Sequence, residues 1–244
     1  MKKRQLNALF IFDLLILVTV TVMLCACDKH EEVVDRSLRI GNVYCADGSV
    51  ISPDDYNTLL QNGDVQPVAL GVIVAVGIDE DNYSALIMSK EDLSGTYAFL
   101  NTYSEEGNNS TSLTTFDGKE NTSMLLNAYN ESTEEDDNGN VSYGIVPDAA
   151  IAATCYTAGY IAGWHLPSVG ELKAAINNIN KISASLAIIG GDIFENDWYQ
   201  TSTVDGSSSE SSMMYNYNVI MPEGRIVSTL KTEAHKVRPF LILR

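Results

Sequence analysis

Apolar residues in the first half of the chain fall into short runs that suit β-strands. "LRIGNVYCADGSVIS", residues 38–52, carries two such runs around Asp47-Gly48, a dipeptide typical of tight hairpin turns. "PVALGVIVAVG", residues 67–77, is a long apolar run rich in β-branched residues, which predicts a strand buried on both faces. A polar turn follows, and we expect "SALIMS", residues 84–89, to return as the antiparallel partner of that strand.

The next part of the chain is more polar, and its apolar residues change to helical spacing. Within residues 101–140 we expect loops around one short helix, "TSMLLNAY", residues 122–129, with Asn121 or Thr122 as its N-cap. The Ala-rich "PDAAIAATCYTAG", residues 147–159, predicts a second helix, because alanine favours the helical backbone. We expect the aspartate near its start to cap it and the closing glycine to end it.

A capping box begins the following helical segment. In "GYIAGWHLPSVGEL", residues 159–172, the Ser168 hydroxyl and the Glu171 carboxylate are spaced to accept from free backbone N–H groups of the first turn. Pro167 favours an extended residue before it, which ends the incoming segment just ahead of this cap. Apolar residues then recur every three or four positions as far as Ile189. This spacing predicts two short helices or one kinked helix, ended by a pair of glycines.

The C-terminal part returns to strand-like runs. "WYQTS", "MMYNYNVI", "RIVSTL" and "KVRPFLIL" are rich in β-branched and aromatic residues, and a "PEG" turn separates the second from the third. The order is therefore strands up to residue 100, helices and loops over residues 101–191, and strands over residues 197–244. This order predicts an α+β fold in which antiparallel sheets carry two or three short helices.

The N-terminal residues predict a bacterial lipoprotein signal peptide over residues 1–26. A basic start is followed by an apolar run that is too short to span a bilayer, and the run leads into "LCAC", residues 24–27. We expect cleavage before Cys27 and lipidation of that cysteine, with residues 27–37 as a polar tether. The alternative is an ordinary secretory signal in which the cysteine occurs by chance.

A lipid on Cys27 would attach the chain to a membrane without a spanning helix. We therefore expect an outer-membrane lipoprotein of a Gram-negative bacterium. "DKHEE", residues 28–32, resembles the export signals of surface-exposed lipoproteins, and the alternative is a solvated tether. Removal of residues 1–26 takes away three basic residues and one acidic residue, so the formal net charge of −17 becomes −19. Such acidity argues against a nucleic-acid partner, because phosphate binding needs clustered Lys and Arg.

No pattern in the sequence predicts a catalytic site, a cofactor or a metal. We expect His165 to be a partly exposed residue before a helix rather than a catalytic base, and neither it nor His235 has a Cys or His at ligand spacing. Nucleophile-elbow and nucleotide-binding motifs do not occur. The acidic loop at residues 131–140 departs from the calcium-loop pattern, so a solvated loop is the simpler interpretation and a calcium site is the alternative.

Two cysteines and three tyrosines each allow two interpretations. After processing, Cys45 and Cys155 remain, and an extracytoplasmic compartment permits a disulfide between them. Alternatively both stay free and behave as small hydrophobic residues.

Tyr199, Tyr215 and Tyr217 are candidates for stacking on sugars, and the competing interpretation places them in the core.

The order of several segments carries a family resemblance. "DGKENT", "CYTAGYIAGWHLPSVGEL", "WYQTST" and "KVRPFLIL" resemble, in that order along the chain, motif segments of the Lcl C-terminal domain family of bacterial collagen-like adhesins. The resemblance covers residues 38–244, most clearly 117–244, and departs at Gln200, where the family usually has Ser. The resemblance implies a structural role for six motif residues: Trp164, Pro167, Ser168, Glu171, Arg238 and Pro239.

The resemblance implies a single C-type-lectin-like domain over residues 38–244, related to formylglycine-generating domains. It implies a non-catalytic surface lipoprotein that serves adhesion or binds glycans or surface proteins. The Glu-Pro-Asn and Trp-Asn-Asp sugar ligands of animal lectins are absent. One alternative is a structural or accessory subunit of a surface assembly such as a pilus. A minor alternative is a formylglycine-generating-type enzyme, which would need Cys45 and Cys155 to meet in a cleft.

Overall fold

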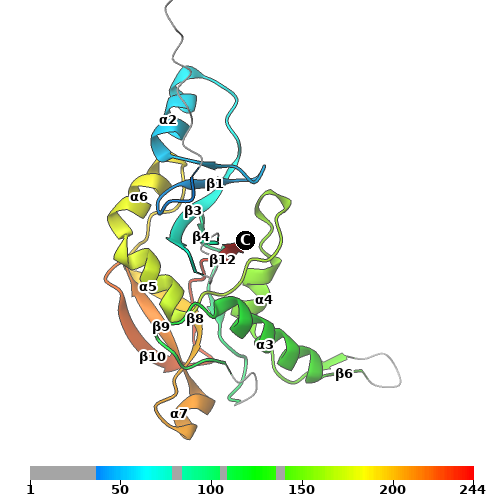
Figure 1. Ribbon diagram of the computed structural model, residues 1–244. Helices are drawn as coiled ribbons and strands as arrows, with labels where there is room; N and C mark the ends of the chain where they lie inside the picture. Colours follow the sequence, from blue (N-terminus) through cyan, green and yellow to red (C-terminus); the bar gives the residue numbers. More distant parts are fainter. Residues whose placement is uncertain (1–36, 79–83, 105–108, 136–140) are drawn as a thin grey trace, which may run out of the picture. The chain divides into compact units, whose positions relative to one another are not determined.

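The apolar run at residues 67–77 forms the central strand of a five-stranded antiparallel sheet (Figure 1). All residues of this strand except the last are buried, as predicted. The strand order is β12-β4-β3-β1-β2, so the predicted hairpin and the predicted return strand are both confirmed. The strands are β1 (Val43–Cys45), β2 (Val50–Ile51), β3 (Ala69–Val76), β4 (Ala85–Ser89) and β12 (Phe240–Leu243).

The computed structural model describes residues 37–78, 84–104, 109–135 and 141–244. The predicted signal peptide, Cys27 and nearly all of the tether therefore lie outside the described residues. All described residues belong to one compact unit. Among the helices of these ranges, none is both long enough and apolar enough to cross a membrane.

A second, three-stranded antiparallel sheet is built from the C-terminal runs in the order β10-β9-β8. Two short pairs, β5 with β11 and β6 with β7, complete the strands. The fold is therefore mixed α and β with antiparallel sheets, as expected. The bounds are β5 (Tyr97–Ala98), β6 (Thr133–Glu135), β7 (Val141–Tyr143), β8 (Asp197–Val204), β9 (Tyr215–Met221), β10 (Arg225–Leu230) and β11 (Ala234–His235).

The described residues contain six α-helices, so the expectation of two or three was wrong. The helices are α2 (Pro53–Asn62), α3 (Gly118–Glu131), α4 (Asp148–Cys155), α5 (Val169–Asn177), α6 (Ile179–Ile188) and α7 (Ser209–Met214). α2 and α7 were missed because they bury very little: Tyr56 is the one buried residue of α2, and α7 buries none. Apolar periodicity cannot reveal such helices. The sequence did contain one signal for α2, because Ser52 is a typical N-cap residue and its hydroxyl accepts from the Asp55 N–H.

Two predicted helix boundaries were wrong. α3 begins at Gly118, with Asp117 in the N-cap position, and not at Asn121 or Thr122. α4 starts at Asp148 and ends at Cys155, because the following residue is extended; the 3-10 turn η1 (Ala158–Tyr160) comes next. The capping box before α5 and the division into α5 and α6 are confirmed.

The five-stranded sheet is covered on both faces. α5 contacts both sheets and α6 packs on β3, and these elements enclose the main core around Val72, Leu172 and Tyr199 (Figure 1). The other face carries a smaller cluster around Ile73 and Trp164. Among the described residues, no α-helix contributes to this second cluster. The loop after α4 covers it together with residues near the start of the domain. This loop also lines a groove on the surface of the protein.

Candidate functional site

The family-like segments meet inside the protein and form a structural junction. The His165 N–H donates to the Phe240 carbonyl at 2.8 Å, and the Phe240 N–H donates back at 3.0 Å. The Ser202 N–H donates to the Pro167 carbonyl at 2.8 Å. The Thr122 hydroxyl accepts from the Leu166 N–H at 3.0 Å. Segments far apart in sequence are thus joined mainly through backbone groups.

The capping box lies at the centre of this junction. The Glu171 carboxylate accepts from the Ser168 N–H at 2.9 Å, and the Ser168 hydroxyl accepts from the Glu171 N–H at 3.3 Å. A Cβ placed on Gly118 would lie 2.1 Å from the Glu171 Oε2, so the start of α3 approaches the carboxylate as only glycine allows. This contact explains why the first residue of α3, four residues ahead of the predicted start, is a glycine.

His165 is enclosed, so the expectation of partial exposure was wrong. Its side chain is 2% exposed and its Nε2 lies 3.2 Å from both carboxylate oxygens of Glu171. Trp164 is 1% exposed and its ring packs edge-on against Tyr156, with 5.1 Å between centroids. Burial leaves neither His165 nor Glu171 accessible to a substrate from solution.

Arg238 connects the terminal segment to two loops. It is fully buried, and its Nε donates to the Asp92 carboxylate at 2.5 Å while its Nη1 donates to the Asp192 carbonyl at 2.9 Å. The Tyr199 hydroxyl donates to the same Asp92 carboxylate at 2.7 Å, and burial followed by the Asp92 charge raises the pKa of Tyr199. The Pro239 carbonyl accepts from the Ser89 N–H at 2.9 Å.

The core interpretation holds for Tyr199, which has no exposed surface for a sugar. Tyr215 and Tyr217 are half-buried on β9. The Tyr217 hydroxyl donates to the Asp205 carboxylate at 2.9 Å. The sugar-stacking hypothesis is therefore wrong for Tyr199 and has little support at the other two positions.

Cys45 and Cys155 are free thiols, so the structure contains no disulfide between them and the disulfide interpretation was wrong. Cys45 is buried in β1, and burial raises the pKa of its thiol to about 11. Cys155 is exposed at the end of α4, which corrects the alternative that it is a buried hydrophobic residue. The thiol of Cys45 is therefore protonated and enclosed at neutral pH, whereas Cys155 is open to reagents in solution.

The acidic run is described only in part. Residues 131–135 end α3 and form β6, whereas 136–140 lie outside the described residues. Over the described ranges, no three His, Cys, Asp or Glu side chains are grouped closely enough to hold a metal ion.

An open groove of about 740 Å³ lies beside the N-terminal end of β3, and we call it the Tyr156 groove. The end of α4 and the loop after it form one wall, and the residues after β4 form the other. Its lining residues are Val68, Ala69, Leu70, Lys90, Glu91, Leu93, Tyr97, Ala152, Cys155, Tyr156, Thr157, Ala158 and Gly159. This volume is within the range of sites that hold small ligands.

The groove offers aromatic surface and uncharged polar groups. Burial raises the pKa of Tyr156 to about 12, with a further increase from Glu91, so its hydroxyl stays protonated at neutral pH. The Tyr97 hydroxyl donates to the Ser94 carbonyl at 2.7 Å, which fixes that ring. Lys90 and Glu91, the charged residues of the lining, pair with each other at 3.2 Å. The lining therefore carries no net charge.

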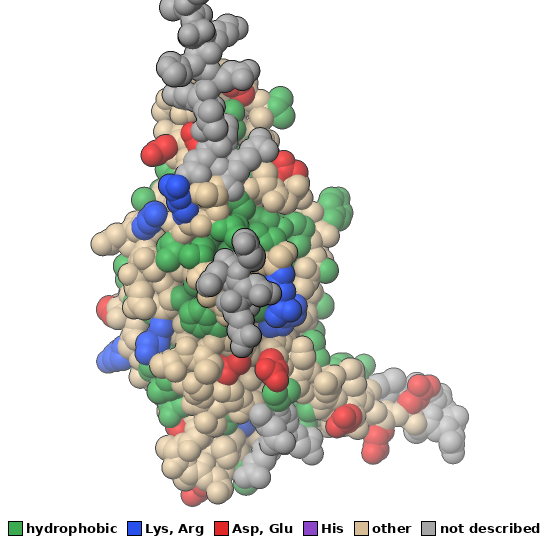
Figure 2. Space-filling model, in the orientation of Figure 1, with side chains coloured by type: hydrophobic (Ala, Val, Ile, Leu, Met, Phe, Trp, Pro, Cys, Tyr) green, Lys and Arg blue, Asp and Glu red, His purple; other side chains and the backbone are tan. Residues whose placement is uncertain are grey.

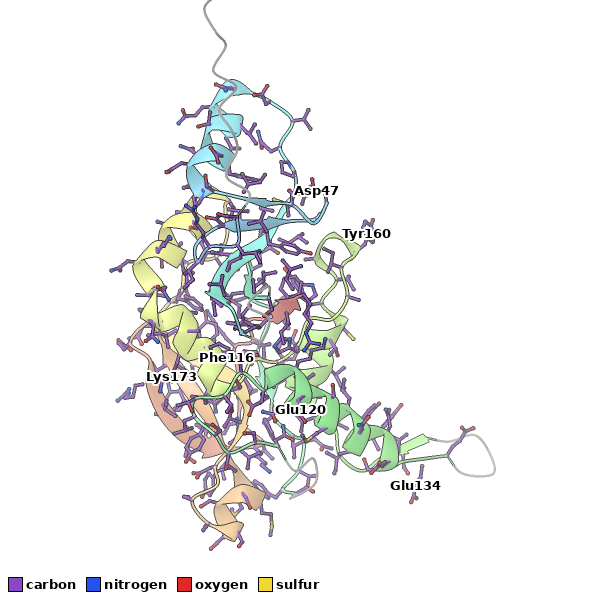
Figure 3. The ribbon with its side chains drawn as sticks, viewed as in Figure 1. Asp47, Phe116, Glu120, Glu134, Tyr160 and Lys173 are labelled. Atoms are coloured by element: carbon purple, nitrogen blue, oxygen red, sulfur yellow. The ribbon has the colours of Figure 1, made fainter. Side chains whose placement is uncertain are left out.

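Apolar side chains continue onto the rim of the groove. Val68 lines the groove and is 62% exposed, and Tyr160, next to the lining residue Gly159, is fully exposed. Tyr160 lies at the tip of the loop after α4 and points away from the ribbon (Figure 3). Figure 2 shows hydrophobic side chains gathered near the middle of the same view, where Figure 1 places the five-stranded sheet.

A second cavity, of about 780 Å³, lies between residues 92–96 and 191–195. Its acidic groups are already engaged: Asp92 binds Arg238, Glu195 accepts from Lys236 at 2.9 Å, and the Asp192 carboxylate accepts from the Asp92 N–H at 3.0 Å. The Tyr156 groove is the better candidate site, because it combines aromatic surface with a hydroxyl that is not tied into such a network.

Sequence reasoning did not find this site. Tyr97 and Lys90 lie outside the family-like segments, and the segment that holds Cys155 and Tyr156 was interpreted as a helix and its end, not as the wall of a groove. A scan against models of known protein families finds no match, and no curated protein matches the chain.

Proposed function

We propose that this protein is a non-catalytic, surface-anchored lipoprotein that binds glycans in the Tyr156 groove and so serves adhesion. The observation that carries the proposal is the groove itself, with two tyrosine rings, uncharged polar groups and an apolar rim. Tyrosine suits sugar recognition because its ring face packs on C–H groups while its hydroxyl exchanges hydrogen bonds. The lipid on Cys27 would hold this site at the outer membrane.

We also propose that the domain belongs to the C-type-lectin-like superfamily through the Lcl C-terminal domain family. The junction supports this, because segments chosen for their likeness to that family contact one another: Trp164–Glu171 with Asp117–Thr122, and both with Trp198–Thr203. A shared junction is what a common fold requires of motifs that are far apart in sequence.

A structural subunit of a surface assembly is the second candidate. β10 is the outer strand of the three-stranded sheet, with no neighbour on its far side among the described residues. An outer strand of six residues can pair with a strand of another chain. The enzyme alternative has less support, because Cys45 is buried and only Cys155 lines the groove.

Chemical blocking of the groove tests the proposal. The full chain in detergent is applied to a glycan array before and after alkylation with a bulky maleimide. Cys155 is exposed and lines the groove whereas Cys45 is buried, so the reagent should fill the groove and abolish binding. The matched control is Cys155→Ala, which should bind glycans before and after the same treatment.

The outcomes separate the candidate functions. Loss of binding in the wild type alone supports the groove as the glycan site. Binding that survives alkylation places the ligand elsewhere, and a protein that binds no glycan but forms oligomers through β10 favours the assembly subunit.

A further inference from the structure

The loop that carries Tyr160 is held firmly from below. A Cβ on Gly159 would lie 2.8 Å from both the Ala46 Cβ and a Leu70 methyl, so the backbone rests directly on the sheet. Ala158 and Ile161 pack against the Trp164 cluster on the second face of the sheet. The loop is therefore anchored on both sides of its tip.

Tyr160 differs from its neighbours. It has φ 62, the one positive φ of a non-glycine residue in the described ranges, and its side chain is fully exposed. The left-handed region is unfavourable for a residue with a Cβ. The Tyr160 ring thus contributes no packing energy to the fold, while the positive φ of its backbone lowers the stability of the fold. In this conformation the ring points out from the tip of the loop, next to the lining residue Gly159 (Figure 3).

We propose that Tyr160 is a second aromatic contact for the ligand of the Tyr156 groove, and that this ligand is a neutral oligosaccharide of at least two sugar rings. The inference rests on the proposed function. One ring lies in the groove beside Tyr97 and Tyr156, and the next packs on Tyr160 at the rim. Neutrality follows from the lining, in which Lys90 and Glu91 cancel each other.

The rigid loop makes this contact favourable. A tyrosine held in place loses little conformational freedom on binding, so more of its contact energy appears as affinity. Aromatic packing of this kind changes affinity by about three- to tenfold. The effect should appear only with ligands long enough to reach the rim.

The test is a length series. Neutral gluco- and galacto-oligosaccharides of one to four rings are titrated against the full chain in detergent, as wild type and as Tyr160→Gly. Wild-type affinity should rise between one ring and two or three. Tyr160→Gly should bind the single sugar as the wild type does and lose about three- to tenfold for the longer chains. The variant should melt no lower than the wild type, because glycine accepts a positive φ.

Tyr143→Ala is the matched control, since Tyr143 is an exposed tyrosine that does not line the groove. It should leave the whole length series unchanged. If Tyr160→Gly follows the wild-type length dependence while alkylation of Cys155 still blocks binding, the rim contact is wrong and the groove stands. If the wild type binds none of these sugars, both the rim contact and the neutral-glycan proposal are overturned.

Discussion

His165 and Glu171 form a buried pair at the point where four sequence segments meet. The His165 Nε2 lies 3.2 Å from each carboxylate oxygen, and neither side chain is more than 2% exposed. The carboxylate also caps α5 through the Ser168 N–H. One glutamate thus makes two structural contacts, with the ring of His165 and with the first turn of α5.

Glu171→Ala should lower the free energy of unfolding by about 3 kcal/mol. The substitution leaves the ring of His165 and the Ser168 N–H buried without their partner, which costs more than the pair itself contributes. Chemical denaturation followed by circular dichroism measures the loss. Glu134→Ala, at an exposed position, should stay within about 0.5 kcal/mol of the wild type. Equal stability of the two variants would show that the pair contributes nothing.

Trp164→Ala should cost about 3–5 kcal/mol, as truncation of large buried aromatics does. Trp164 is 1% exposed and supports the sheet face under the groove. The other tryptophan provides a natural comparison: Trp198 is 36% exposed and stacks on His235. Trp198→Ala should therefore cost less than half as much in the same thermal or chemical unfolding experiment. A larger loss at Trp198 would contradict the burial difference.

The two thiols should react at very different rates. In a chain that starts at residue 36, a small alkylating reagent should add one label to the native protein, at Cys155, and a second only after unfolding, at Cys45. Intact mass gives the count without any reduction step. If neither cysteine takes a label, before or after unfolding, the two cysteines form a disulfide and the prediction is wrong.

Cys45 should make the protein less stable at alkaline pH. Burial raises the pKa of its thiol from 9.0 to about 11, so the unfolded chain releases this proton first. The stabilisation is complete below pH 9 and is lost progressively between pH 9 and about 11. Unfolding free energies of the wild type and Cys45→Ala, measured across this range, should converge as pH rises. A constant difference would rule out a thiol contribution.

Cys27→Ala should abolish lipid attachment. Cells fed an alkyne fatty acid should yield a labelled wild-type protein that fractionates with membranes and an unlabelled variant. The anchor prediction fails if both proteins carry the same label. The soluble variant would also provide a lipid-free form for the binding experiments.

Much of the fold could be predicted from local pattern. A continuous β-branched run predicted β3, and the apolar run after the polar turn predicted β4. The Asp-Gly turn predicted the first hairpin, and the spacing of Ser168 and Glu171 predicted the start of α5. These signals are local, because a strand, a turn or a cap is defined by residues within a few positions of one another. The candidate site could not be found in this way, since its walls come from segments far apart in the sequence.

The sequence by itself determined the main strands, the helices α3 to α6 and the acidic charge, and it predicts the lipid anchor at Cys27. Only the tertiary structure decided that His165 is enclosed, that Cys45 and Cys155 are free thiols, and that Tyr97 and Tyr156 line one groove. Burial and proximity depend on how sheets and loops pack over long sequence separations. Gly118 is the clearest case: nothing near it in sequence explains its place in α3, whereas the carboxylate of Glu171, 2.1 Å from where a Cβ would lie, does.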